Sequence, residues 1–122
     1  MAEPFSEMLA ELVDRVDGAV GAAFVDSYGE AVQCHVASGG DDEYVKLMGA
    51  YQGIAFQTSR MICSQLDSGG IDYFYTSYAN VSFLIKSLDQ DYFVMLVLSP
   101  EANVGQGIYA IRKSADGFNN EM

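Results

Sequence analysis

One uninterrupted segment, Glu43 to Leu66, constrains the fold more than any other part of the chain. It follows the good N-capping residues of "GGDD", contains no proline, and repeats its apolar residues at helical spacing. A helix of this length measures about 35 Å at 1.5 Å per residue. With successive residues 100° apart, one broad face collects Tyr44, Leu47, Met48, Tyr51, Ile54, Ala55, Thr58, Met61, Ile62 and Leu66. We expect this broad face to meet the core.

Two glycines one turn apart, Gly49 and Gly53, stand inside the same helix, where each costs about 1 kcal/mol relative to alanine. On the same helical projection they lie on the side opposite the broad face, together with Val45, Phe56, Arg60 and Cys63. Missing side chains there would leave a shallow notch for a neighbouring backbone. We therefore predict a contact stripe for a second protomer or another protein; the alternative is a pair of tolerated glycines on a solvated face. The predicted stripe consists of Val45, Gly49, Gly53, Phe56 and Arg60.

The segments on either side of this helix predict two more helices and five strands. Apolar residues recur at helical spacing over 4–16 and again from Val104 to Phe118. Extended segments are expected at 19–25, 30–38, 71–79, 81–88 and 92–99, separated by turns such as "DSYG" and "DQD".

These elements follow the order αββαβββα and fit a single domain over residues 1–122. Links of hairpin length make the strands mainly antiparallel, and the long helix serves as a crossover. The predicted fold class is α+β, with a five-stranded sheet covered on both faces.

Composition narrows the classes of partner. A formal charge of −11, from six basic and seventeen acidic residues, repels phosphate backbones and anionic membranes. Nucleic acid is therefore an unexpected partner, and the apolar runs are too short to insert into a membrane. No targeting signal is evident and the two cysteines form no C-x-x-C pair, so we expect a cytoplasmic protein with reduced thiols.

The sequence contains no recognisable catalytic or ligand-binding motif. The single histidine, His35, has no sequence signature linking it to a serine or cysteine nucleophile, and there is no P-loop motif. The acidic group Asp41 to Glu43 is better explained as a helix start than as a cation site. We therefore predict no catalytic residue, no cofactor and no metal.

Two stretches resemble the roadblock/LC7 family: "VDGAVGAAFVDSYGEAV" at 16–32 and "YFVMLVLSPEANVGQGIYAIRK" at 92–113. The second is the more specific, with an apolar strand, Pro-Glu-Ala-Asn-x-Gly and an amphipathic helix. The resemblance covers nearly the whole chain and implies a profilin-like fold, with the central helix on one face of the sheet and the first and last helices on the other. It also implies a dimer in which the sheets pair edge to edge and the central helices lie side by side.

Members of this family bind Ras-like small GTPases or serve as scaffolds and light chains, so the resemblance implies a homodimeric, non-enzymatic regulator of a Ras-like GTPase. The third strand, with Tyr73 and Tyr75, is rich in aromatics for a solvated edge and suits pairing in a homodimer. Arg60 could act as an arginine finger on the GTPase; an ion-paired surface arginine is the simpler explanation. Two alternatives stay open: an assembly subunit with no nucleotide-dependent partner, and a sensor with a small-ligand cavity lined by tyrosines and methionines.

Overall fold

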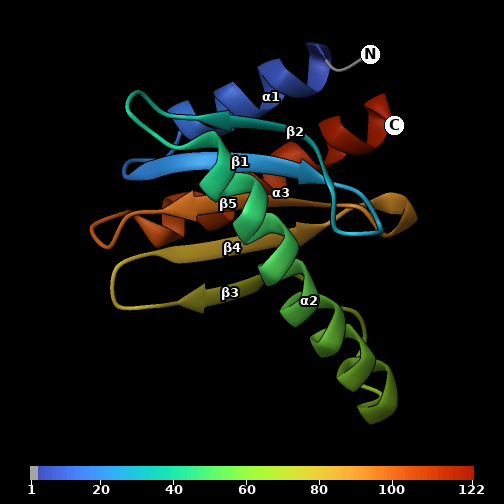
Figure 1. The fold of residues 1–122 in the computed structure, drawn as a ribbon. Coiled ribbons are helices and arrows are strands. Elements are labelled where there is room, and N and C mark those ends of the chain that lie inside the picture. The colour runs from blue at the N-terminus through green and yellow to red at the C-terminus, as the bar shows by residue number, and fades with distance from the viewer. Residues whose placement is uncertain (1–2) are drawn as a thin grey trace.

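The computed structural model describes residues 3–122 and has three layers, with one sheet between helices (Figure 1). The elements follow the predicted order. They are α1 Glu3–Asp14, β1 Ala19–Val25, β2 Ala31–Val36, α2 Asp42–Leu66, β3 Phe74–Ser77, β4 Ser82–Ser87, the 3-10 turn η1 Asp89–Asp91, β5 Phe93–Leu98 and α3 Val104–Glu121. The predicted α+β class and the five-stranded sheet are confirmed.

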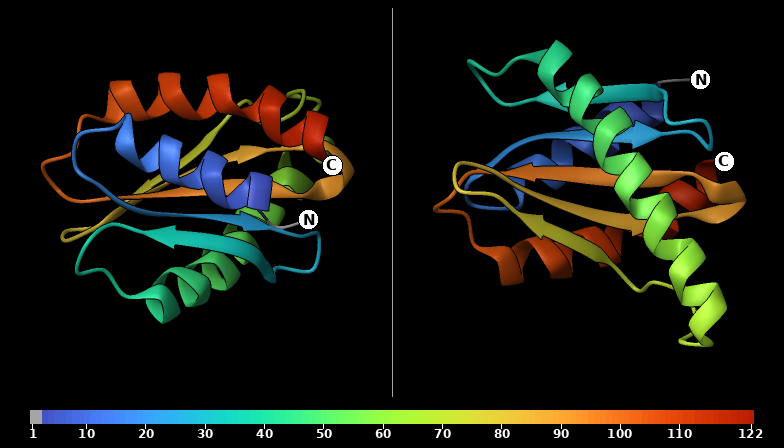
Figure 2. Two further views of the ribbon diagram at one scale, coloured as in Figure 1. Left: turned by 90° about the horizontal axis from the view of Figure 1, so that it is seen from above. Right: turned by 60° about the horizontal axis from the view of Figure 1, so that its bottom comes forward.

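The sheet is antiparallel throughout and has the strand order β2-β1-β5-β4-β3. Because β2 and β3 are the two outer strands, the connection between them must cross the sheet. Helix α2 makes this crossing diagonally over one face, and its last turns extend beyond β3 (Figure 1; Figure 2, right). Helices α1 and α3 cover the opposite face (Figure 2, left).

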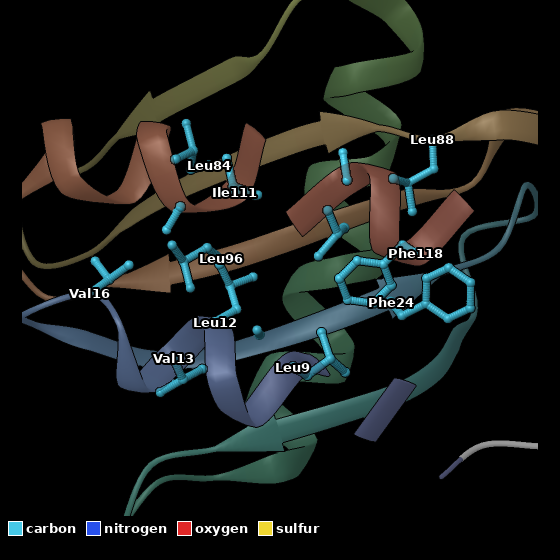
Figure 3. Close-up of a cluster of buried hydrophobic side chains, with 14 of the residues drawn as sticks. Leu9, Leu12, Val13, Val16, Phe24, Leu84, Leu88, Leu96, Ile111 and Phe118 are labelled. Atoms are coloured by element: carbon cyan, nitrogen blue, oxygen red, sulfur yellow. The ribbon is translucent and has the colours of Figure 1, made fainter. Parts of the chain in front are cut away.

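The face under α1 and α3 carries the larger of two hydrophobic cores (Figure 3). Aromatic rings join the layers, with Phe24 of β1 stacked 5.5 Å from Phe118 of α3 between ring centroids. The core also contains Leu9, Leu12, Val16, Leu84, Leu96 and Ile111. Here both terminal helices bury the apolar stripes that the sequence predicts. Over residues 3–122, none of the helices has both the length and the apolar character needed to span a bilayer.

The second core lies between α2 and the sheet, and it corrects the predicted orientation of this helix. Val45 is 2% exposed and Phe56 is fully buried, and both glycines, Gly49 and Gly53, are buried with them. The prediction that these four residues lie on the outward side is wrong. Most of the broad face expected to meet the core instead points away from the sheet. Its large exposed members are Tyr44, Leu47, Tyr51, Ile54, Met61, Ile62 and Leu66.

The glycines face the sheet because the strands below them carry bulky side chains. A Cβ atom at Gly53 would lie 3.2 Å from Cζ of Phe93, and one at Gly49 would lie 3.4 Å from Cγ2 of Val25. Without these side chains the helix can approach the strands closely, and Phe56 then meets the edge of Phe93, with ring centroids 5.5 Å apart. The notch exists, but the protein's own sheet fills it.

The start of α2 agrees with the sequence interpretation of its acidic residues. The Asp41 side chain caps the helix by accepting from the backbone N–H groups of Glu43 (3.0 Å) and Tyr44 (3.4 Å). Asp42 and Glu43 occupy the first turn, where negative charge complements the helix dipole. The helix ends at Asp67, which adopts the left-handed conformation with φ 54°.

Candidate protein-binding surface

The outward face of α2 carries seven of the fourteen large hydrophobic residues that are exposed in the described part of the chain. Ile54 is 65% exposed and Leu66 is 68% exposed. Further exposed apolar residues lie along α2, which crosses the sheet diagonally from β2 to β3 (Figure 1). Single exposed apolar residues are normal, but a contiguous row on one element marks a site of contact with another molecule. We call this row the α2 ridge. It consists of Tyr44, Leu47, Tyr51, Ile54, Met61, Ile62 and Leu66.

Spacing along the α2 ridge suits packing against another helix. Tyr44, Leu47, Tyr51, Ile54, Thr58 and Met61 are separated alternately by three and four residues. This is the a and d spacing of a coiled-coil seam, in which the side chains of one helix fit between those of its neighbour. The sequence contains this signal. Periodicity alone favours packing of this face against the sheet, because an isolated chain is expected to bury its widest apolar face.

A buried polar network fixes α2 to the edge strand. The Gln52 amide donates to the hydroxyl of Tyr78 at 3.0 Å and accepts from the hydroxyl of Thr76 at 2.9 Å. Gln52 is 5% exposed, and both hydrogen bonds satisfy groups that would be costly to bury alone. Sequence reasoning missed Gln52, because one polar residue on a helix gives no sign of its partners on a strand 24 residues away.

The two strands at the edges of the sheet differ in how open they are to pairing. In β2 the register with β1 shifts between Phe24 and Val25, so that Val32 is an extra residue in the outer strand. A bulge of this kind discourages further pairing. The four-residue pairing of β3 with β4 has no such shift, which leaves β3 the more suitable edge for another strand.

Tyr73 and Tyr75 lie at this edge on the side of the sheet covered by α3. The Tyr73 ring is 37% exposed and lies beneath the guanidinium of Arg112, 5.7 Å from its centroid. The Tyr75 hydroxyl donates to the Ser82 hydroxyl at 3.4 Å. Both tyrosines thus lie at the β3 edge but on the face opposite the α2 ridge, and their role in partner contact stays a prediction.

Asp72 anchors the loop before β3 to the rest of the domain. Its carboxylate accepts from Arg112 of α3 at 2.6 Å and from Lys86 of β4 at 3.4 Å, and its backbone carbonyl accepts from Lys86 at 2.9 Å. The β3 edge is therefore attached to α2 on one side and to α3 on the other, which keeps a four-residue strand in position.

Arg60 is half-buried and engaged within its own chain. Its guanidinium pairs with Asp91 at 2.5 Å, donates to Gln57 at 3.4 Å and lies 5.6 Å from the centroid of the Phe56 ring. The ion pair agrees with the simpler explanation given by the sequence, whereas the expectation of a fully outward position is wrong. An arginine finger acting in trans would require the pair with Asp91 to break, and that role stays untested.

Nucleophile chemistry has no geometric support in residues 3–122. The Cys34 thiol donates to the Asp42 carboxylate at 2.9 Å, and His35 makes no hydrogen bond to a serine or cysteine in this part of the chain. Burial, followed by the bond to Asp42, raises the pKa of Cys34 to about 12, which suppresses the reactive thiolate. No cluster of three His, Cys, Asp or Glu side chains in the described residues could hold a metal.

The interior between α2 and the sheet is filled with side chains. Phe56, Phe93, Met95 and Val97 are all buried there, with Phe74 packed against them. Within residues 3–122, the hollows that border α2 are grooves at the surface. The geometry therefore gives the small-ligand sensor no specific support.

Comparisons with known proteins place this geometry among solved structures. The sequence matches no protein-family model and no curated protein. Similar structures include the roadblock/LC7 domain from Streptomyces avermitilis (TM-score 0.84, 14% identity, 95% of each chain covered). MglC from Myxococcus xanthus has a TM-score of 0.70 and 22% identity, over 98% of this chain and 99% of that one. An MglB with a tetrameric arrangement has a TM-score of 0.86 and 13% identity, over 97% of this chain and 87% of that one.

Identities this low speak for the fold alone, yet the likeness extends over nearly the full length of all these chains. The order of elements, the antiparallel sheet and the separation of α2 from α1 and α3 agree with the expectations drawn from 16–32 and 92–113. This chain has the roadblock/LC7 fold.

Proposed function

We propose that this chain is a homodimeric, non-enzymatic regulatory or scaffold domain that binds a Ras-like small GTPase in the cytoplasm. The observation that carries the proposal is the α2 ridge, whose C-terminal part reaches the open β3 edge. Its large side chains are all at least 37% exposed, although the sheet side of the same helix is fully packed. Helix α2 is apolar on two sides. One side packs on the sheet, and the other is available to a partner molecule.

A second copy of the chain fits this surface. Pairing β3 with its copy would continue the sheet, and the two α2 helices would then lie side by side across the junction. Covering a half-exposed leucine or isoleucine is worth on the order of 1 kcal/mol, so the α2 ridges of two copies supply several kcal/mol together. The similar MglB structure with a tetrameric arrangement supports association of this fold with itself.

The GTPase part of the proposal rests on the family resemblance and on the likeness to MglB and MglC. The paired α2 helices would form a broad platform, which could press the GTPase's own catalytic groups into place without lending a residue. This mode agrees with the engagement of Arg60 by Asp91.

Light scattering tests the dimer. We expect the wild-type protein to have twice the mass of the chain and Ile62→Glu to be monomeric, because a carboxylate in a dry interface is costly. Tyr109→Glu is the matched control, since Tyr109 is 66% exposed on α3, on the other face. A monomeric wild-type protein would contradict the homodimer.

Affinity capture from cell extract loaded with GTP or with GDP tests the partner. We expect a small GTPase to be retained in one nucleotide state and lost with Ile62→Glu. A hydrolysis assay with that purified GTPase then separates stimulation from binding alone. A bound protein that ignores the nucleotide would support the assembly-subunit alternative instead.

A further inference from the structure

The α2 ridge is too wide for one neighbouring helix. At 100° per residue, its side chains together with Ala50 span about 160° of the helix surface. Tyr51, Ile62 and Leu66 lie on the flank toward β3, where the proposed second copy would cover them. Leu47, Ile54 and Met61, spaced seven residues apart, form a straight row toward the β1–β2 turn. One neighbour on the β3 side leaves this second row uncovered.

A groove runs between the second row and the β1–β2 turn. It has a volume of about 360 Å³ and is bounded by the turn residues 27–29 on one side and by Ala50, Ile54 and Met61 on the other. Gly53 and Phe93 also line it. A second hollow of about 370 Å³ shares Gly29 and Ala50 with it, so the two hollows adjoin along α2, and together we call them the groove.

Tyr28 stands at the tip of the turn with 91% of its surface exposed. The turn itself is rigidly built: the Asp26 carboxylate accepts from the N–H groups of Tyr28 at 2.9 Å and Glu30 at 3.0 Å, and two backbone hydrogen bonds join its ends. In residues 3–122 the Tyr28 ring has no aromatic partner and its hydroxyl makes no hydrogen bond. An exposed tyrosine on an ordered turn beside an apolar groove is typical of an anchor for a binding partner.

The walls of the groove determine which shape of partner fits. Helix α2 uses its backbone groups internally, and the N–H groups of Asp26, Tyr28, Gly29 and Glu30 are bonded within the turn. An extended segment would therefore find no continuous row of backbone donors and acceptors here, unlike at a sheet edge. A helix satisfies its own backbone and needs only side-chain contacts.

The charges at the rim determine the polarity of the partner. Glu30 and Glu43 line the groove, and Asp26 lies in the adjoining turn. Lys46 is the basic residue that lines the groove, and it is already paired with Asp42 at 3.3 Å. With a formal charge of −11 on the whole chain, this rim favours a partner that carries lysine or arginine.

We propose that the groove between α2 and the β1–β2 turn is a second docking site, which binds a basic amphipathic helix of a partner protein. This proposal rests on the proposed homodimer in one respect: the second copy covers the β3 flank of α2 and leaves the second row free. The groove itself lies within one protomer, so the two proposals can fail independently.

Fluorescence anisotropy with a designed peptide tests this site. The probe is a labelled helix of about 18 residues, some 27 Å long, with leucine and phenylalanine on one face and lysine on the other. Two matched probes have the same apolar face with glutamate in place of lysine, and the same composition in scrambled order. We expect saturable binding of the first probe and at least about tenfold weaker binding of both others.

Variants place the binding in the groove. Tyr28→Ala removes an exposed ring, and Ala50→Arg fills the groove with a side chain of the same positive charge as the lysines of the probe. Each variant should weaken binding at least about fivefold. Tyr109→Ala on α3, outside both proposed surfaces, should leave it unchanged. Thermal melting confirms that each variant is folded. Failure of the first probe to bind, equal binding of the scrambled probe, or insensitivity to both groove variants would overturn the proposal.

Discussion

Gly49 and Gly53 show how the space around a single residue determines what a helix can pack against. Neither glycine has a side chain on the sheet side of α2, but the space available for an added Cβ atom differs between the two positions. A Cβ atom at Gly49 makes ordinary contact with Val25, whereas one at Gly53 presses on the buried ring of Phe93. That ring is held by Phe56 and has little freedom to move.

The two alanine variants should therefore differ in stability. Gly49→Ala gains helix propensity of about 1 kcal/mol without a clash and should be more stable than wild type. Gly53→Ala gains the same propensity but displaces Phe93, so we expect it to be at least about 1 kcal/mol less stable than Gly49→Ala. Urea unfolding measures both. Equal stabilisation by the two substitutions would show that Phe93 adapts freely.

Cys34 and Asp42 form a second residue-scale pair with a consequence for pH. Burial and the Asp42 carboxylate raise the pKa of Cys34 from 9.0 to about 12. The folded state thus holds this proton more tightly than the unfolded state, and the stability it contributes is present below pH 9.0 and lost as pH rises to about 12. Hydrogen bonds from Cys34 and Lys46 lower the pKa of Asp42, whose contribution is lost as pH falls below its ordinary value of 3.8.

Thiol alkylation in the Cys63→Ser variant reports the titration of Cys34 directly. In the folded protein we expect the alkylation rate to keep rising well beyond pH 9.0, because the thiolate forms only toward pH 12. The same variant unfolded in urea should level off near pH 9.0. If both profiles level off at the same pH, neither burial nor the Asp42 hydrogen bond raises the pKa of Cys34 in the folded protein.

At the scale of elements, the attachment of α2 to β3 gives the edge of the sheet its shape. Strand β3 has only four residues and pairs with one neighbour, so its own hydrogen bonds hold it weakly. Gln52 of α2 adds two hydrogen bonds, one to Thr76 and one to Tyr78. Asp72 connects the loop before β3 to β4 and α3. An edge prepared in this way is ordered before any partner arrives, which lowers the entropic cost of pairing.

Replacing Gln52 should loosen this edge selectively. We expect Gln52→Leu to cost about 1 to 2 kcal/mol, because it leaves the hydroxyls of Thr76 and Tyr78 without their partner. Hydrogen exchange should accelerate in β3 and stay unchanged in β1. Tyr78→Phe, which removes one of the two hydrogen bonds, should have a smaller effect; uniform acceleration across the sheet would argue against a local role.

Charge acts at the scale of the whole molecule. A homodimer brings together two chains of formal charge −11, and their mutual repulsion opposes the apolar contact along α2. Salt screens this repulsion, since the Debye length falls from about 30 Å at 10 mM to about 8 Å at 150 mM.

The proposed dimer should therefore tighten as salt rises. Between about 10 and 150 mM sodium chloride, we expect the dimer dissociation constant from sedimentation to fall several-fold, and Ile62→Glu to stay monomeric throughout. A dissociation constant that rises with salt would indicate that ion pairs between protomers, rather than the α2 ridge, hold the dimer.

Much of this architecture could be predicted from the sequence because its signals are local. The capping residues of α2, the turns between strands and the apolar stripes of α1 and α3 depend on neighbours a few residues away, and the element order follows from them. The short 3-10 turn at Asp89–Asp91 and the shortness of β3 were less evident, because they depend on contacts with distant parts of the chain.

The candidate surface could be predicted only in part, and α2 shows why. Its sequence specifies a helix with apolar residues on two sides, one built around glycines and one around large side chains. Hydrophobicity alone favours burying the larger side, but which side fits depends on the shape of the strands beneath it. Phe93, Val25 and Met95 leave room only for a helix surface without side chains at Gly49 and Gly53, so tertiary packing, not periodicity, turned the large residues outward.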